Sequence, residues 1–303
     1  MAIFNRIKHF LSLRHQVSQM EHRLKYNSRY DWLIEKALNS TTIGISSDLY
    51  CDKEIIVSLT TYGKRLHYVS ATIESIMQGS MKPNRIVLWL GNEMKDMPLP
   101  ITLQNQQVRG LEISFCNDIR SYTKLIPSLR EYPNANIITI DDDVLYNYDL
   151  VENLVNEHRK TPNYIIANRI HRVQLDTNGR PMKYLDWKWN DSPSDVSPLN
   201  FLTGVGGVLY PPKSLDPEVL NESVFLDICK YADDIWFYAM ALKADSRIIK
   251  GFTHSEIGED YYVNGDVQDM GLCHINNGAG RKNDEQFKAV FEKYNLWDSL
   301  TKE

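Results

Sequence analysis

The sequence predicts an α/β fold with a mostly parallel central sheet flanked by helices, and an extra helical segment at the N-terminus. Two observations lead to this class. Short apolar runs rich in β-branched residues alternate with segments of helical periodicity from residue 54 onward, and the chain before them is helical in pattern throughout. The 303 residues are 43% hydrophobic and 24% charged, an ordinary globular composition that excludes collagen-like and disordered classes.

The N-terminal segment, residues 1–45, is predicted to be an amphipathic helix over 2–39 followed by a Ser/Thr/Gly-rich linker. Residues 1–30 contain six basic residues and one acidic residue, a net charge of +5, whereas the whole chain carries −5. No apolar run approaches the roughly 18–20 residues of a membrane-spanning helix. Apolar residues at spacings of 3 and 4 form one stripe, namely Phe10, Leu13, Val17, Met20 and Leu24.

From residue 54 onward each element is predicted from its own local pattern. The first strand is the β-branched run Ile55 to Leu59, which ends at the turn Tyr62-Gly63, and Pro83 closes the helix that follows. Residues 91–110 are expected to form a polar loop. Irregular structure is expected from about residue 169 to 200. The same reasoning predicts strands at 55–59, 85–90, 111–115, 136–140, 164–168, 208–210 and 247–251, and helices at 66–78, 123–130, 148–160, 232–243 and 283–295.

The sharpest chemical signal is the triplet Asp141-Asp142-Asp143, directly after the β-branched strand at 136–140. Three adjacent carboxylates repel one another, and at the end of a buried strand they need a cation or hydrogen-bond donors to stay ionised. Their oxygen atoms suit Mg²⁺ or Mn²⁺, and ligands of open α/β sheets bind beyond the carboxyl ends of the strands. A solvated acidic turn is the alternative.

A second acidic pair, Asp233-Asp234, opens the predicted helix at 232–243. Asp233 fits an N-cap that complements the helix macrodipole. Asp234 precedes Ile-Trp-Phe and so lies near the buried face, which makes it a candidate general base. The segment 204–207, Gly-Val-Gly-Gly, either lets the backbone approach a sugar closely or forms a tight turn. His274 taken alone fits a structural histidine.

Polar and basic residues follow the predicted strands and suit a nucleotide. Thr60, Thr61 and Arg65 come directly after the first strand, and Lys124 precedes an apolar helix. Arg281, in Gly-Ala-Gly-Arg-Lys, suits a diphosphate. Taken singly, each of these is more often an ordinary surface residue. The acidic net charge argues against a nucleic-acid partner.

Taken in order, these segments resemble nucleotide-sugar glycosyltransferases of the GT-A fold. The segment Thr72-Ile73-Glu74-Ser75-Ile76, with Gln78 and Pro83 after it, is similar to one in the family 2 enzymes. The triplet, the Gly-rich segment, the acidic pair and His274 follow one another as in fringe-like and exostosin-like enzymes. The resemblance covers roughly residues 54–280 and implies a Rossmann-like GT-A catalytic domain over 46–303, with a nucleotide-binding half at about 54–145, an acceptor-binding half at about 146–282 and a C-terminal helix at 283–303.

The resemblance also implies a role for each matching residue. The donor would be a UDP-sugar, and Asp141 and Asp143 would bind Mn²⁺ or Mg²⁺ with His274 as a further ligand. Asp234 would deprotonate the acceptor hydroxyl in an inverting reaction, beside Asp233, which stands where the family pattern has Glu. Core packing is the alternative for the two tryptophans. The implied nucleotide contacts are Thr60, Thr61, Arg65, Lys124, Asp141, Asp142 and Arg281, and the implied acceptor contacts are Trp187, Trp189, Gly206 and Gly207.

Two other functions fit part of the pattern. A sugar-phosphate nucleotidyltransferase should carry a Gly-rich basic loop after its first strand, where this chain has one glycine. A non-catalytic sugar-binding module on the same fold would not need the triplet, the acidic pair and the histidine together.

The resemblance further suggests bacterial surface polysaccharide synthesis, of capsule or O-antigen, on a lipid-linked saccharide acceptor. The basic residues 1–30 would then lie on the inner face of the cell membrane, or pack against a second subunit of a homodimer or the catalytic domain. A cytoplasmic location is expected because no secretory signal follows the basic start. Buried reduced thiols without a CxxC pair are expected for Cys51, Cys116, Cys229 and Cys273.

Overall fold

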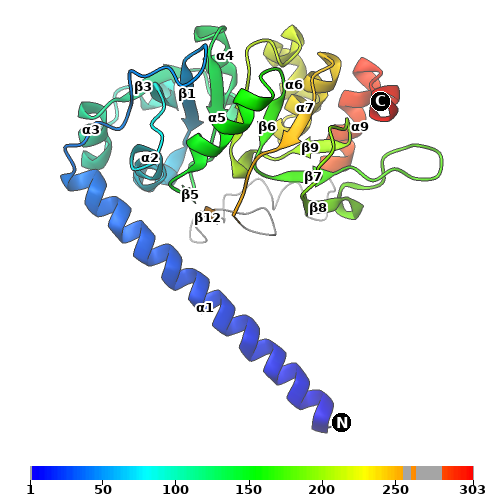
Figure 1. Ribbon diagram of the computed structural model, residues 1–303, viewed down its shortest axis with the longest axis horizontal. Coiled ribbons are helices and arrows are strands. Elements are labelled where there is room, and N and C mark those ends of the chain that lie inside the picture. The colour runs from blue at the N-terminus through cyan, green and yellow to red at the C-terminus, as the bar shows by residue number, and fades with distance from the viewer. Residues whose placement is uncertain (1, 255–260, 264–281, 303) are drawn as a thin grey trace.

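The computed structural model describes residues 2–254, 261–263 and 282–302 (Figure 1). Within these residues a seven-stranded sheet has the order β11-β6-β10-β4-β1-β2-β3. Neighbouring strands are parallel, except that β10 is antiparallel to both β4 and β6. The predicted α/β class with a mostly parallel central sheet is therefore confirmed. The strands are β1 (Ile55–Thr60), β2 (Arg85–Gly91), β3 (Leu111–Cys116), β4 (Asn136–Thr139), β6 (Ile165–Ala167), β10 (Val208–Tyr210) and β11 (Ile248–Lys250).

All seven predicted strands are present, and β1 illustrates why they could be predicted. Ile55 and Val57 pack into the core beneath the helices on one face of the sheet, while Ile56 packs on the opposite face. A strand buried on both faces is a continuous apolar run in the sequence. One face is covered by α2 (Val69–Met77) and α5 (Leu150–Lys160), and the other by α4 (Ile126–Glu131), α7 (Asp233–Lys243) and α9 (Lys282–Tyr294).

The prediction of a polar loop over residues 91–110 is wrong, because α3 (Ile101–Val108) lies there. Its buried residues are Leu103 and Gln106, so the helix lacks the repeating apolar residues that mark a helix in a sequence. The predicted helices at 66–78 and 123–130 are each divided, since a 3₁₀ turn precedes α2 over Gly63–His67 and another precedes α4 over Arg120–Lys124.

The stretch from residue 169 to 200, expected to be irregular, also contains strands. A three-stranded antiparallel sheet has the order β8-β7-β9. Its strands are β7 (Ile170–Arg172), β8 (Lys188–Asp191) and β9 (Asn200–Leu202). These short strands mix polar with apolar residues, so they form no continuous apolar run of the kind that marks the strands of the central sheet. Outside this sheet, the sequence analysis also did not predict the helix α6 (Glu222–Ile228) or the antiparallel strand pair β5 (Val144–Tyr146) and β12 (Tyr261–Val263).

The predicted N-terminal helix is confirmed as α1 (Ala2–Asn39), whose N-terminal end stands away from the rest of the molecule (Figure 1). Its C-terminal half packs on the body through Leu33 and Ala37, which are fully buried. The Arg29 guanidinium donates to the Tyr146 carbonyl at 2.5 Å, so α1 also holds β5. By contrast, the predicted apolar stripe is 45–68% exposed, at Phe10, Leu13, Val17, Met20 and Leu24.

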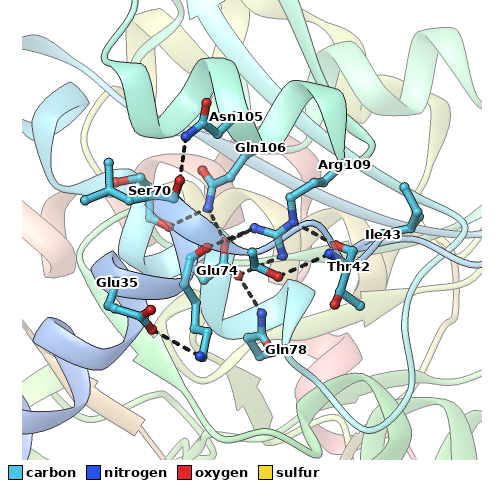
Figure 2. A network of polar contacts seen from close by, with 12 residues as sticks. Glu35, Thr42, Ile43, Ser70, Glu74, Gln78, Asn105, Gln106 and Arg109 are labelled. Carbon is cyan, nitrogen blue, oxygen red and sulfur yellow. Dashed lines mark hydrogen bonds and ion pairs between the residues drawn. The ribbon is translucent and has the colours of Figure 1, made fainter.

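A buried ion pair joins α2 to α3 beneath the end of α1 (Figure 2). The Arg109 guanidinium donates to both carboxylate oxygens of Glu74, at 2.8 and 2.9 Å, and the two side chains are 2% and 0% exposed. The side-chain amides of Gln78 and Gln106 donate to the same carboxylate at 2.7 and 2.8 Å. Because Arg109 Nε also donates to the Thr42 carbonyl at 2.7 Å, the pair fastens the linker after α1 to the body.

Candidate functional site

The carboxyl ends of β1 and β4 meet at one edge of the sheet. The chain runs from β1 to β2 and β3 on one side and returns to β4 on the other, so the strand order reverses between β1 and β4. Ligands of open α/β sheets bind at such a reversal. Thr60 ends β1 and residues 61–65 follow it. The acidic triplet comes shortly after β4, and Ser58 of β1 is paired to Thr139 of β4. The sheet order therefore brings the two predicted groups of site residues together.

Asp142 points into this junction and is held by residues that follow β1. Thr61 Oγ1 donates to Asp142 Oδ2 at 2.6 Å, and the Arg65 guanidinium donates to Oδ1 at 2.8 Å. Thr72 of α2 donates to the Asp142 carbonyl at 3.0 Å. Burial raises the pKa of Asp142, while Arg65 and Thr61 act against that rise. Two expected nucleotide contacts, Thr61 and Arg65, thus position the triplet itself.

Asp143 and Asp141 lie on either side of this anchor. The Arg65 guanidinium lies 3.2 Å from Asp143 Oδ2, and the Lys124 ammonium lies 2.9 Å from Asp141 Oδ1. Burial raises the pKa of Asp143 to about 7; repulsion from Asp141 adds to the rise, and Arg65 opposes it. A carboxylate under this repulsion is stabilised when a cation binds beside it.

Lys124 links the triplet to the second acidic pair. Its ammonium lies 2.9 Å from Asp141 Oδ1 and also 2.9 Å from Asp233 Oδ2, with 8% of the side chain exposed. Burial lowers the pKa of Lys124, but the attraction of Asp141, Asp233 and Asp234 outweighs that effect and raises the pKa well above its ordinary value. Lys124 is therefore charged and joins the loop after β4 to the first turn of α7, two segments that lie far apart in the sequence.

The second acidic pair opens α7, but not as expected. Ala232 is the N-cap residue, and Asp233 is the first residue of the helix with its carboxylate on Lys124, so its prediction as an N-cap is wrong. The Gly204 N–H donates to Asp234 Oδ1 at 3.0 Å. Burial raises the pKa of Asp234 to about 7; repulsion from Asp233 adds to this, and Lys124 opposes it.

The Gly-rich segment contributes through Gly204, which the sequence did not single out as a site residue. A Cβ there would lie 2.7 Å from Lys124 Nζ and 3.1 Å from Asp234 Oδ1, so only glycine leaves both groups in place. At Gly206 a Cβ would meet Arg169 at 2.8 Å, and Gly207 has φ +86° and faces Leu150. The last two glycines are explained by close packing within the fold.

Tyr146 is a second residue that sequence reasoning missed. Its hydroxyl accepts from the Asp141 N–H at 2.9 Å and donates to the Val205 carbonyl at 3.0 Å. It thus ties the triplet to the Gly-rich segment. A tyrosine three residues beyond the triplet is the only signal in the sequence, and it does not show that the hydroxyl turns back.

The expected acceptor residues occupy different environments. Trp187 is 5% exposed and packs on Phe201 and Phe287, the core arrangement that was its alternative. Trp189 is 40% exposed and stacks on His171 at a centroid distance of 4.7 Å. A groove of about 470 Å³ lies beside the three-stranded sheet β8-β7-β9. Its lining includes Arg172, Lys188, Asp191 and Asp195.

The remaining expected site residues lie elsewhere. Thr60 Oγ1 donates to the Trp89 carbonyl of β2 at 2.9 Å, on the side of β1 that faces away from β4. His274 and Arg281 lie outside the described residues.

Several solved structures match this chain distantly, at 12–13% identity and TM-scores of 0.40–0.49. No family model and no curated protein matches the sequence. A fragment of TarS from S. aureus is 13% identical, with 80% of this chain and 73% of that chain covered and a TM-score of 0.45. The mannosyltransferase PcManGT from Pyrobaculum calidifontis, in complex with GDP-Man and Mn²⁺, is 12% identical, with coverages of 94% and 78% and a TM-score of 0.49. CMP:2-keto-3-deoxy-manno-octonic acid synthetase with CTP is 13% identical, with coverages of 65% and 88% and a TM-score of 0.40.

The assembled cluster is strongly acidic. Among the described residues, five carboxylates lie with two cations at the junction of β1, β4 and α7, which gives these seven side chains a formal charge of −3. A hard divalent cation fits a site of carboxylate oxygens with this excess charge. Asp141 and Asp143 are the residues that could hold it. Both carboxylate oxygens of Asp142 accept hydrogen bonds, from Thr61 and Arg65, whereas Lys124 contacts one oxygen of Asp141 and Arg65 one oxygen of Asp143.

Proposed function

We propose that this protein is a metal-dependent glycosyltransferase of the GT-A type, which transfers a sugar from a UDP-sugar to a hydroxyl group of a saccharide acceptor. The observation that carries the proposal is the linkage of two acidic groups through Lys124. One group follows β4 at the strand-order reversal, and the other opens α7. In a metal-dependent transfer, one such group would hold the cation that binds the diphosphate, and the other would take the proton of the acceptor hydroxyl.

In this proposal Asp141 and Asp143 hold Mn²⁺ or Mg²⁺, and His274 is an expected further ligand. The bound ion would stabilise the negative charge that develops on the departing diphosphate. Arg65 holds the triplet in place and adds a positive charge close to the same phosphates. Thr60 and Lys124 border the place where the nucleotide would lie.

Asp234 is proposed as the general base. An acceptor hydroxyl is a poor nucleophile, and a carboxylate within hydrogen-bond distance removes its proton as the new bond forms. The Gly204 N–H holds one oxygen of Asp234 and so sets the direction of the other. A pKa raised to about 7 suits a base that works near neutral pH. A base acting on the face opposite to the leaving group gives inversion.

Incubation with a panel of UDP-sugars and GDP-mannose, with Mn²⁺, Mg²⁺ or a chelator, tests the proposal. We expect release of UDP from one donor, dependent on the metal and accelerated by a saccharide acceptor. Formation of a nucleotide sugar and pyrophosphate from a sugar phosphate and a nucleoside triphosphate would assign a nucleotidyltransferase instead. If the protein binds a sugar but neither turns over a donor nor binds a nucleotide with metal, it would be a sugar-binding module.

We also propose that α1 places this enzyme on an anionic membrane surface, where a lipid-linked acceptor for surface polysaccharide synthesis would lie. None of the described helices is long and apolar enough to cross a membrane. The exposed stripe of α1 is accompanied by a net charge of +5 over residues 1–30. Two such helices would repel one another, whereas anionic lipid attracts each basic residue by about 1 kcal/mol.

Vesicle flotation of the full chain and of a Phe10→Ser/Val17→Ser/Leu24→Ser variant tests this placement. These side chains are 62–68% exposed, so the fold should tolerate the changes. We expect the original chain to float with anionic vesicles at low salt and the variant to stay in solution. The contrary result is a dimer of the original chain in sedimentation that is lost in the variant, with no flotation of either. It would show that the stripe of α1 contacts a second copy of the chain and not a membrane.

A further inference from the structure

Three potential metal ligands meet at the other end of β1. Cys51 and Asp52 lie in the segment that leads into this strand, and His158 lies in the last turn of α5. One ligand atom from each, a sulfur, a carboxylate oxygen and a ring nitrogen, lies within 4.8 Å of the others. The six residues of β1 span roughly 17–20 Å at about 3.3 Å per residue, so this cluster is separate from the acidic triplet.

His158 is the residue that indicates a missing ligand. Its side chain is 3% exposed, and its Nδ1 is buried without a hydrogen bond to any described residue. Buried polar atoms almost always have a partner, because an unsatisfied one loses its hydration without compensation. A metal ion bound to the imidazole would act as the partner of the coordinating nitrogen in place of water or a hydrogen-bond donor. It would also fix the orientation of the ring.

The contacts of the sulfur bear on its use as a metal ligand. The Cys51 thiol donates to the Lys53 carbonyl at 3.3 Å, a bond that coordination of a metal ion by the thiolate would break. Asn136 Nδ2 donates to Cys51 Sγ at 3.3 Å, which stabilises negative charge on sulfur. Arg159 Nε donates to the Tyr50 carbonyl at 2.7 Å, so the segment is already fastened to α5 beside His158. The Lys53 ammonium lies 3.9 Å from Asp52, a loose and exposed contact that a dication can replace.

We propose that Cys51, Asp52 and His158 bind one zinc-like transition-metal ion that clips the start of β1 to α5. Sulfur, imidazole and carboxylate together favour such an ion over Mg²⁺ or Mn²⁺. Tetrahedral zinc holds such ligand atoms about 3.3–3.6 Å apart, so atoms that lie within 4.8 Å of one another need to approach by no more than about 1.5 Å. Asp52 is 74% exposed and can make that movement. A water molecule would complete four ligands.

Cobalt titration of the chelator-treated full chain, in reducing buffer, tests the site. We expect one equivalent of Co²⁺ to give a thiolate-to-cobalt charge-transfer absorption in the near ultraviolet, which Zn²⁺ abolishes by displacement. Cys51→Ser should remove this absorption and weaken zinc binding by more than about 100-fold. Cys116→Ser, at another partly buried free thiol, should change neither. His158→Asn should weaken binding as Cys51→Ser does.

Three results would overturn the site. The original chain could bind Co²⁺ without thiolate absorption, as at a cluster of carboxylates. The absorption could survive in Cys51→Ser. Both cysteine variants could bind zinc as the original does. Since Cys51→Ser is a small change at a partly exposed position, it remains informative even where His158→Asn fails to fold. None of these readouts depends on donor turnover, so they are independent of the proposed transferase activity.

Discussion

Replacement of Arg109 by methionine is expected to lower the free energy of unfolding by about 3–5 kcal/mol, the range for a buried ion pair that loses one partner. The Glu74–Arg109 pair is almost completely buried, so we expect a loss toward the upper end of that range. Arg109 is 2% and Glu74 0% exposed, so water cannot hydrate the carboxylate that remains. Gln78 and Gln106 would still donate to it, but neither amide neutralises its charge. Loss of the bond from Arg109 to the Thr42 carbonyl adds about 1 kcal/mol.

Urea and thermal unfolding of the full chain measure the effect of Arg109→Met. For a chain of 303 residues we expect the melting temperature to fall by roughly 6–10 °C. A Glu74→Leu/Arg109→Met variant should recover most of the loss, because neither charge is then left buried. Lys160→Met, at a pair whose side chains are 67% and 22% exposed, should cost no more than about 0.5 kcal/mol. A loss below about 1 kcal/mol for Arg109→Met would refute the reasoning.

Four further predictions concern the candidate site and the stability of the fold around it. Asp143→Ala should abolish Mn²⁺-dependent UDP binding, measured by calorimetry. The control Asp227→Ala, at an exposed carboxylate of α6, should not change it. Equal affinity for UDP in both variants would show that Asp143 is not a metal ligand. Asp234→Asn should lower kcat by roughly 10²–10⁴-fold with UDP affinity retained, and normal turnover would exclude Asp234 as the base. Because burial raises the pKa of Asp234 to about 7 and the base must be ionised, kcat/KM should rise about tenfold from pH 6 to pH 8; a flat profile would contradict this. Burial lowers the pKa of His171 to about 3 in the folded protein. Below about pH 6.5 this histidine therefore binds a proton in the unfolded chain but stays neutral in the folded one. The free energy of unfolding should therefore fall by about 2 kcal/mol between pH 6.5 and 5, and His171→Asn should lose that part of the slope in urea titrations.

The elements that local patterns predict are those whose residues are buried in a regular way. The β-branched run of β1 is buried on both faces, so its position could be predicted within one residue. The missed helix α3 buries only Leu103 and Gln106, and Gln106 is held by hydrogen bonds to Glu74 and the Ser70 carbonyl rather than by an apolar face. Such a helix depends on its neighbours, and its own sequence shows no periodicity.

The sequence by itself determined the alternation of strands and helices, the length of α1, and the two acidic groups that follow β4 and open α7. These follow from short-range periodicity and from the residue types that tolerate burial. Only the tertiary structure decided that Lys124 pairs with both Asp141 and Asp233, that Asp142 is held by Thr61 and Arg65, and that the stripe of α1 is exposed. Those contacts depend on the order in which strands pair across the sheet, and a residue's own neighbours in the chain carry no information about that order.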